Sequence, residues 1–137
     1  EIAKLDIDVI ICSPLRRTVQ TCKLINKNNV KVIYDRRIME RNAGSMQFKS
    51  DKNIDINLWY DVNKELIYKN TEGFKKIRER AADILEDIKI KYEGKNVLLV
   101  THGDFSKAMR TYLSGETDAL KIKAMKHKNC EIIEYDI

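Results

Sequence analysis

Two short apolar runs in the chain each lead into a stretch with helical periodicity. Residues 97–100 are Val-Leu-Leu-Val, and Thr101-His102-Gly103 follow directly. A run of this length with β-branched members favours a strand covered on both faces, as in a parallel sheet. Apolar residues then recur on one helix face until Ser114-Gly115 supplies a stop, at Phe105, Ala108, Met109, Tyr112 and Leu113. The pattern predicts a strand-to-helix corner that carries His102.

The same pattern occurs near the start of the sequence. Val9-Ile10-Ile11 lead through Cys12 to Ser13-Pro14, which predicts a helix N-cap followed by proline at the first helical position. The apolar face of this second helix consists of Leu15, Thr18, Val19, Cys22 and Ile25. Arg16 and Arg17 therefore fall in its first turn.

The remaining pattern completes an α/β protein. Residues 30–35 read as a strand, 36–53 as a loop, and 130–137 alternate polar and apolar residues as a last strand. A long helix is expected from Thr71 and ends at Gly94, and its apolar face holds Phe74, Ile77, Ala81, Ile84, Leu85, Ile88 and Tyr92. With a short helix before this long one and another after the His102 helix, the order predicts a three-layer α/β/α sandwich. Its mostly parallel sheet has at least four strands.

Composition narrows the class of protein. The 137 residues are 43% hydrophobic with a single proline, which favours one globular domain over 1–137. No apolar stretch approaches the roughly 20 residues that span a bilayer, and three cysteines without CxxC spacing suggest neither a disulfide framework nor a zinc site. We expect a cytoplasmic protein.

The net charge of +5 is compatible with nucleic acid, an anionic membrane or a phosphorylated small molecule. The basic run 121–128 has no interleaved aromatic residue, which favours a solvated helix face. We expect no nucleic-acid or membrane partner.

Candidate chemistry lies at the two predicted corners. Parallel strands end at the same edge of a sheet, so Arg17 and His102 are expected at one rim, where ligands of open α/β sheets bind. The guanidinium fork matches an oxyanion, and a helix N-terminus adds partial positive charge. Taken singly, a histidine after a strand is more often structural, so the hypothesis depends on the pair.

Four segments resemble motifs of the histidine phosphatase superfamily, which includes the cofactor-dependent phosphoglycerate mutases. They are SPLRRTVQT (13–21), IMERNAGSMQ (38–47), TEGFKKIRER (71–80) and LLVTHGDFSKAMRTYL (98–113), and KNCEIIEYDI resembles the closing strand. Together they cover nearly the whole chain in the family's order. The resemblance implies a phosphoglycerate mutase-like fold.

The resemblance also implies a site and a mechanism. One imidazole attacks phosphorus to form a phosphohistidine, a carboxylic acid protonates the departing oxygen, and water hydrolyses the intermediate. Arg17 would clamp phosphate oxygens, His102 would donate to a non-bridging oxygen, and Glu40 would be the proton donor and then the base. The implied phosphate- and substrate-binding residues are Arg17, His102, Gly103, Ser13 and Arg41. No metal and no cofactor is implied.

The family's nucleophilic histidine stands in an R-H-G segment on its first strand, and no such segment occurs here. The two histidines are His102 and His127, and His127 has no arginine before it or glycine after it. We therefore expect an N-terminally truncated domain that lacks the family's first strand and is inactive alone; a degenerate relative is the alternative.

In the family the missing strand lies between the strands that here are 97–101 and 131–135. We expect 131–135 to pair directly with 97–101, a second copy to fill the place as a homodimer, or the chain to fold poorly.

The expected function is hydrolysis of a phosphoric monoester of a small molecule. The short interval between Glu40 and His102 favours a phosphatase. The ERNAG loop resembles the mutase version, in which Arg41 would bind a substrate carboxylate, so a cofactor-dependent phosphoglycerate mutase stays open. A relative that only binds phosphorylated ligands or another protein also stays open.

Overall fold

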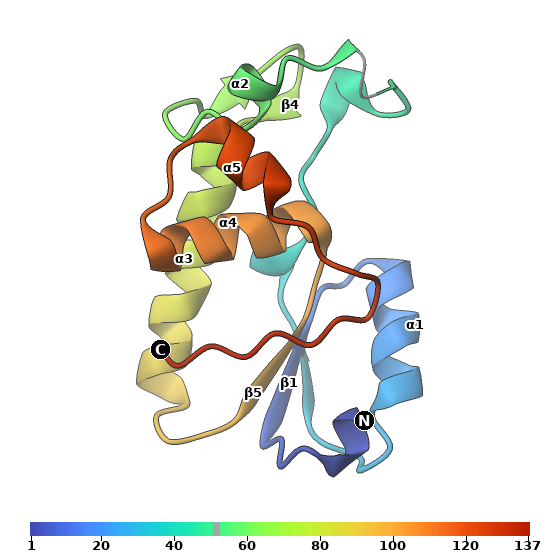
Figure 1. Cartoon of the computed structure of the whole chain (residues 1–137). Helices are drawn as coiled ribbons and strands as arrows, with labels where there is room; N and C mark the ends of the chain where they lie inside the picture. Colours follow the sequence, from blue (N-terminus) through green and yellow to red (C-terminus); the bar gives the residue numbers. More distant parts are fainter. Residues whose placement is uncertain (51–52) are drawn as a thin grey trace.

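A three-stranded parallel sheet forms the centre of the protein (Figure 1). The structure is a computed structural model that describes residues 1–50 and 53–137. Its strands are β1 (Val9–Cys12), β2 (Val32–Tyr34) and β5 (Val97–Val100), in the order β2-β1-β5. All three were predicted from apolar runs, and both pairings are parallel. The predicted α/β class is confirmed.

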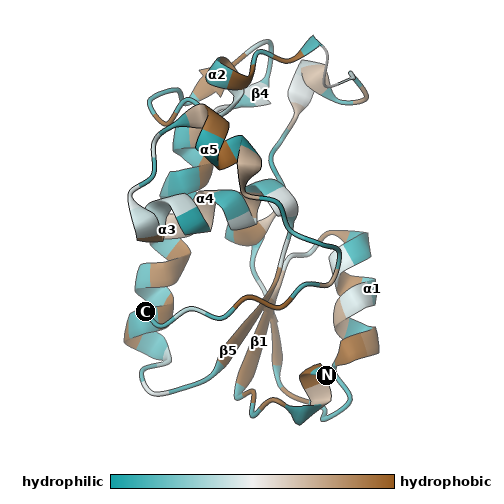
Figure 2. Cartoon of the chain, in the orientation of Figure 1, coloured by the Kyte–Doolittle hydropathy of each residue, from teal (hydrophilic) through white to brown (hydrophobic). Residues whose placement is uncertain are grey.

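Helices cover both faces of this sheet, which gives the predicted three layers (Figure 1). Helix α1 (Arg16–Ile25) lies on one face, and α3 (Phe74–Lys91) and α4 (Gly103–Ser114) lie on the other. Alternate residues of a strand point to opposite faces, so β1 supplies both cores. Ile10 packs in a cluster with Cys22 of α1, and Ile11 packs with the buried faces of α3 and α4. The hydropathy colouring shows the resulting apolar strands (Figure 2).

The helices follow the predicted periodicity closely, except at their N-terminal ends. The long helix begins at Phe74, because Thr71 belongs instead to a small strand. Helix α1 begins at Arg16 after an extended Leu15, so the predicted Ser13 N-cap is wrong. The Ser13 hydroxyl lies against the ring of His102, as described below.

The segment between β2 and α3 is largely irregular, as predicted. It holds single turns η2 (Arg36–Ile38) and η3 (Gly44–Met46), the short helix α2 (Ile56–Trp59), and a hairpin of β3 (Leu66–Ile67) and β4 (Thr71–Glu72). Of the loop predicted over 36–53, residues 51–52 lie outside the described part of the chain. The segment forms the upper part of the molecule, above the carboxyl ends of the strands (Figure 1).

The predicted strand over 130–137 is wrong. After the short helix α5 (Ala119–Ala124), the chain turns at Cys130 and crosses in front of the sheet without strand pairing (Figure 1). Alternating polarity alone does not make a strand, which also needs a ladder of backbone hydrogen bonds with a neighbour. Residues 131–135 therefore do not pair with 97–101, and a fourth strand is absent from the sheet as described.

A further 3-10 turn, η1 (Ile2–Lys4), precedes β1.

Among the helices of residues 1–50 and 53–137, none combines the length and apolarity that crossing a bilayer requires.

Candidate functional site

Ser13, Arg17 and His102 meet at the carboxyl ends of β1 and β5. Because these strands pair directly, Ser13 and His102 follow neighbouring strand ends, and the Ser13 amide donates to the Val100 carbonyl at 3.0 Å. The Nε2 of His102 lies 2.8 Å from the Ser13 hydroxyl, and the Arg17 Nε donates to Nδ1 of the same ring at 3.2 Å. The rim predicted from the two corners is therefore formed without any contribution from residues 131–135.

These contacts fix the protonation state of the imidazole. A guanidinium can only donate, so Nδ1 of His102 is an acceptor and carries no proton. The neutral ring then holds its proton on Nε2 and donates it to Ser13. Burial, followed by the nearby charges of Arg17 and Arg80, lowers the pKa of His102 from 6.5 to about 4. At neutral pH the rim offers a cationic fork and a neutral N–H donor side by side.

Glu40 lies beside the helix that begins at this rim. Burial raises the pKa of its carboxyl, and Asp104 raises it further, although backbone N–H groups in the first turn of α4 oppose both effects. The Arg41 amide donates to Oε1 at 3.0 Å. Just upstream, the Thr101 hydroxyl donates to the Ile38 carbonyl at 2.7 Å, which ties the Glu40 segment to the end of β5. A carboxyl with a raised pKa beside this rim is suited to donate a proton.

Arg80 of α3 anchors the same segment from below. Its Nη1 donates to the carbonyls of Arg37 and, at 3.0 Å, Met39. Its Nε and Nη2 form a two-pronged ion pair with Glu72 at 2.8 and 3.0 Å, and Glu72 also accepts from the Asn42 amide. Backbone groups on both sides of Glu40 are thus bound to a single arginine–glutamate pair, which positions the carboxyl.

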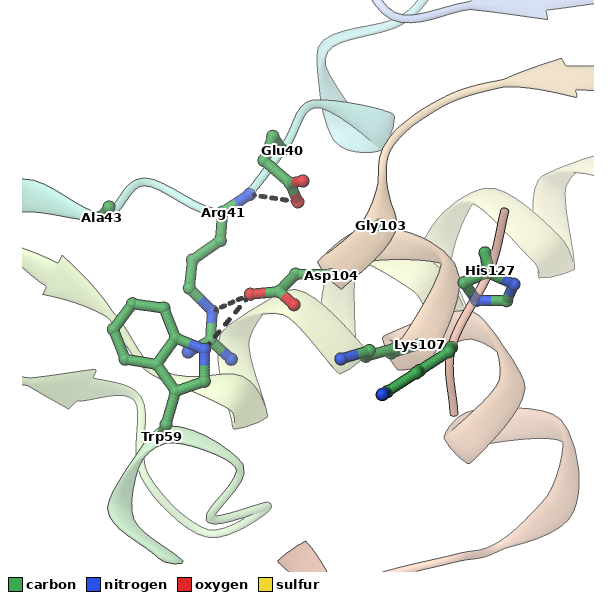
Figure 3. Close-up of a pocket in the computed structure, with 9 residues that line it drawn as sticks. Glu40, Arg41, Ala43, Trp59, Gly103, Asp104, Lys107 and His127 are labelled. Atoms are coloured by element: carbon green, nitrogen blue, oxygen red, sulfur yellow. Dashed lines mark hydrogen bonds and ion pairs between the residues drawn. The ribbon is translucent and has the colours of Figure 1, made fainter. Parts of the chain in front are cut away.

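Arg41 is almost completely buried, with 1% of its side chain exposed. Its guanidinium lies 4.2 Å from the Trp59 ring, and its Nε is 3.4 Å from Asp104 Oδ2 (Figure 3). Asp104 also accepts from Trp59 Nε1 at 3.3 Å and from the Tyr60 hydroxyl at 3.4 Å. Burial lowers the pKa of Arg41. The sequence prediction placed Arg41 in substrate binding but gave no sign of these partners.

A pocket of about 480 Å³ opens next to the rim, and Figure 3 shows the residues that line it. Its lining residues are Glu40, Arg41, Ala43, Trp59, Gly103, Asp104, Lys107, Lys126 and His127. Gly103 joins the pocket to the rim because it directly follows His102. An added Cβ at Gly103 would meet no other atom within 4 Å, so the described fold itself does not require glycine there.

Sequence reasoning missed several of these lining residues. Lys107 lies one helical turn after Gly103, so its presence on this side follows from helix geometry. Asp104 directly follows the predicted binding residue Gly103, and this adjacency was the one feature of the sequence that could have indicated its place in the pocket. Trp59 and His127 come from α2 and from the segment after α5, and no local pattern pointed to either.

Metal-ligand geometry is absent from the described ranges 1–50 and 53–137, where no group of three or more histidine, cysteine, aspartate or glutamate side chains could hold an ion.

Comparison with known proteins assigns the chain to a family. The family model of the histidine phosphatase superfamily (branch 1) matches residues 1–137 of this chain. Phosphoserine phosphatase 1 of Hydrogenobacter thermophilus is 25% identical over 122 residues, which are 84% of this chain and 58% of that protein. The chain thus spans less than two thirds of the length of this curated relative.

Solved structures share the fold. YhfR of Bacillus stearothermophilus superposes with a TM-score of 0.73 at 23% identity, covering 87% of this chain and 63% of YhfR. A mycobacterial glucosyl-3-phosphoglycerate phosphatase gives a TM-score of 0.74 at 18% identity, covering 91% of this chain and 65% of that one. The same mycobacterial enzyme is also known in complex with inorganic phosphate.

Proposed function

The chain belongs to branch 1 of the histidine phosphatase superfamily, and on that premise we propose that its rim is the phosphoryl-binding half of a phosphoric monoester hydrolase. One observation carries the proposal: a guanidinium, a neutral imidazole N–H and a buried carboxyl with a raised pKa converge beside the start of α4. These groups match the needs of phosphoryl transfer, which are anion binding, charge stabilisation and a proton for the leaving group.

Each residue has a definite task in the proposed reaction. Arg17 binds non-bridging phosphoryl oxygens, and the partial positive charge at the start of α4 stabilises them. The Nε2–H of His102 donates to Ser13 in the structure. When substrate binds, it donates instead to another non-bridging phosphoryl oxygen. Gly103 leaves the approach to the helix N-terminus open.

Glu40 handles the protons. A second histidine attacks phosphorus, the bond from phosphorus to the ester oxygen breaks, and Glu40 donates its proton to that oxygen. Water then attacks the phosphohistidine, its proton passes to Glu40, and phosphate leaves with the histidine restored. Burial favours the protonated form of Glu40 that the first step needs.

We further propose that this second histidine lies outside residues 1–137. His127 borders the pocket, but it has neither the arginine nor the glycine that flank the family's nucleophile. The 137-residue chain is then a phosphate-binding unit that turns over nothing by itself. The same feature fits a relative that binds phosphorylated ligands without catalysis, so the experiment has to separate the two.

The first arm of the experiment measures binding. Inorganic phosphate or vanadate, titrated into the labelled chain, should shift NMR signals of residues 13–17 and 101–104. Arg17→Ala should abolish the shifts. Arg16→Ala, which removes the same charge from the same helical turn, should leave them in place. An Arg17→Ala protein that binds phosphate like the wild type would contradict the assigned rim.

The second arm measures hydrolysis of p-nitrophenyl phosphate without added metal. The 137 residues should be inactive, and a version preceded by an R-H-G strand encoded upstream should be active. Activity of the longer version that survives Glu40→Gln unchanged would refute the proton-donor role. Turnover by the 137 residues with a phosphate on His102 would reverse the roles of the two histidines, and an inactive longer version would favour the binding-only relative.

A further inference from the structure

The pocket beside the rim is the space into which the leaving group of the proposed reaction extends. Glu40, the proposed proton donor to the ester oxygen, lines this pocket, and Gly103 joins it to the rim. The atoms beyond the ester oxygen therefore enter a volume of about 480 Å³, which accommodates a small organic group. The chemistry of the pocket wall then decides which leaving groups bind best.

The charged groups of this wall have partners within the protein. Asp104 forms an ion pair with Arg41 and accepts a hydrogen bond from the Tyr60 hydroxyl. Lys107 donates to the same hydroxyl at 2.8 Å, and although burial lowers the pKa of Lys107, the nearby Asp104 and Glu40 raise it. The side chain of Arg41 is 1% exposed, so its guanidinium is closed off from a ligand in the pocket.

The other polar residues of the wall offer little to a leaving group. Both ring nitrogens of His127 are buried, so this ring presents neither a donor nor an acceptor to the pocket. Lys126 is exposed, and an exposed ammonium is strongly hydrated. The remaining lining is apolar, and its one aromatic carbocycle is the indole of Trp59.

Trp59 is held in place as a flat part of the wall. It ends the short helix α2, and its Nε1 donates to Asp104 at 3.3 Å. The guanidinium of Arg41 lies 4.2 Å from the centre of the ring. Trp59 is only partly buried, and Figure 3 shows its indole at one side of the pocket with the guanidinium beside it. A ring fixed in this way loses little conformational entropy when a second ring packs against it.

From this arrangement we infer that Trp59 is a stacking platform for the leaving group. The site then selects phosphomonoesters whose ester oxygen carries a flat aromatic group, attached directly or through one carbon. Offset-stacked or edge-to-face aromatic pairs add about three- to tenfold in affinity beyond the contact area that they bury. A saturated ring of the same size buries similar area without this gain. The inference rests on the proposed phosphoryl-binding rim, which anchors the ester.

The test compares ligands that differ only in their ring. Phenyl and benzyl phosphate are paired with cyclohexyl and cyclohexylmethyl phosphate, at pH 8, where all four are dianions because the second pKa of a phosphate monoester is about 6. Dissociation constants come from NMR titration of the 137-residue chain, followed at residues 13–17 and 101–104. We expect at least one aromatic ligand to bind about three- to tenfold more tightly than its saturated partner.

Fluorescence gives a direct second readout, because Trp59 is the only tryptophan of the chain. The preferred aromatic ligand should change the emission of Trp59 with the same dissociation constant that NMR finds at the rim. Inorganic phosphate occupies the rim alone and should leave the emission nearly unchanged. An aromatic ligand that shifts the rim signals without changing the emission would overturn the stacking.

Matched variants locate the effect. Trp59→Leu should reduce the preference for the aromatic ligand to less than about twofold, while inorganic phosphate still binds at the rim and shows that the fold is intact. Trp59→Phe keeps a ring and should retain the preference. Phe48→Leu removes a ring that is 97% exposed to solvent, and it should leave the preference as it is in the wild type.

The two ways to fail are distinct. Equal affinities within both ligand pairs, or a preference that survives Trp59→Leu, would overturn the stacking platform while leaving the rim in place. If neither inorganic phosphate nor any of the four esters shifts residues 13–17 and 101–104, the proposed phosphoryl-binding function itself fails, and the platform fails with it.

Discussion

The neutral state of His102 makes the stability of the protein depend on pH in a specific window. An unfolded histidine has a pKa near 6.5, whereas burial and the charges of Arg17 and Arg80 lower the pKa of His102 in the folded protein to about 4. Between about pH 6.5 and pH 4, His102 is therefore protonated in the unfolded chain and largely unprotonated in the folded protein. The sign follows directly: this group destabilises the fold progressively as pH falls from about 6.5 to 4, and it has no effect above that window.

The magnitude follows from the two pKa values. Linkage gives a loss of about 2 kcal/mol in the free energy of unfolding between pH 7.5 and pH 5, rising to about 3 kcal/mol near pH 4. That loss is a large fraction of a typical domain stability of about 5–15 kcal/mol. Acidic groups with lowered pKa values, such as Asp35, titrate below this window and add little above pH 5.

The assay combines urea unfolding with NMR of the imidazole nitrogens. His127 also has a pKa lowered by burial, so His127→Gln is the background in which His102 is the one remaining histidine. In that background His102 should contribute a fall of about 2 kcal/mol in the free energy of unfolding from pH 7.5 to 5. This contribution is the difference in slope from the additional variant His102→Gln, because Glu40, whose pKa is raised, acts in the opposite direction in both proteins. The ¹⁵N shifts should report a proton on Nε2.

Arg17→Met tests the cause of the lowered pKa. The pKa of His102 should rise above about 4 but stay below 6.5, because burial is the largest of its three causes and Arg80 remains. A His102 that titrates near 6.5 in the wild-type rim, or one that carries its proton on Nδ1, would refute the hydrogen-bonding scheme. The proposed donor role of Nε2 would then fail as well.

Two further substitutions test the framework around the site. Arg80→Met should lower the free energy of unfolding by about 2–4 kcal/mol, because it leaves Glu72 and two backbone carbonyls without their shared donor; urea denaturation that finds less than about 0.5 kcal/mol would show that the anchor is dispensable. Gly44→Ala should cost more than about 2 kcal/mol, since the residue has a φ of +49° and a Cβ would strike the Asn70 carbonyl. Gly94→Ala is its control in thermal unfolding, because Gly94 has a φ of +68° but open space around it, and an equal loss at both positions would remove the steric argument.

The two strand-to-helix corners were predictable because their signals are local. Four apolar residues followed by a 3.6-residue period describe β5 and α4 completely, and the left-handed Gly115 ends α4 where Ser114-Gly115 predicted a stop. The motif resemblance then assigned these corners to a family, and the family's fold is confirmed. Parallel strands bring their carboxyl ends together, so the shared rim of Arg17 and His102 also followed from sequence.

Local signals were insufficient wherever a backbone element needs a distant partner. Residues 130–137 have the alternation of a strand, but they pair with no strand among residues 1–50 and 53–137 and cross the sheet as irregular chain. Ser13 reads as an N-cap, yet its hydroxyl contacts His102, 89 residues away, and the helix starts later. In the first case the lack of a strand partner decided the outcome, and in the second a contact with a distant residue did; no local pattern encodes either.

The sequence by itself determined the strands, the main helices and the two corners, because side-chain periodicity and turn residues act over a few positions. Only the tertiary structure decided the electrostatic state of the site. The neutral imidazole depends on burial and then on Arg17, the raised pKa of Glu40 depends on burial, and the buried guanidinium of Arg41 depends on its ion pair with Asp104. Burial and charge separation are properties of the packed molecule, since they are set by atoms that the chain brings together from distant positions.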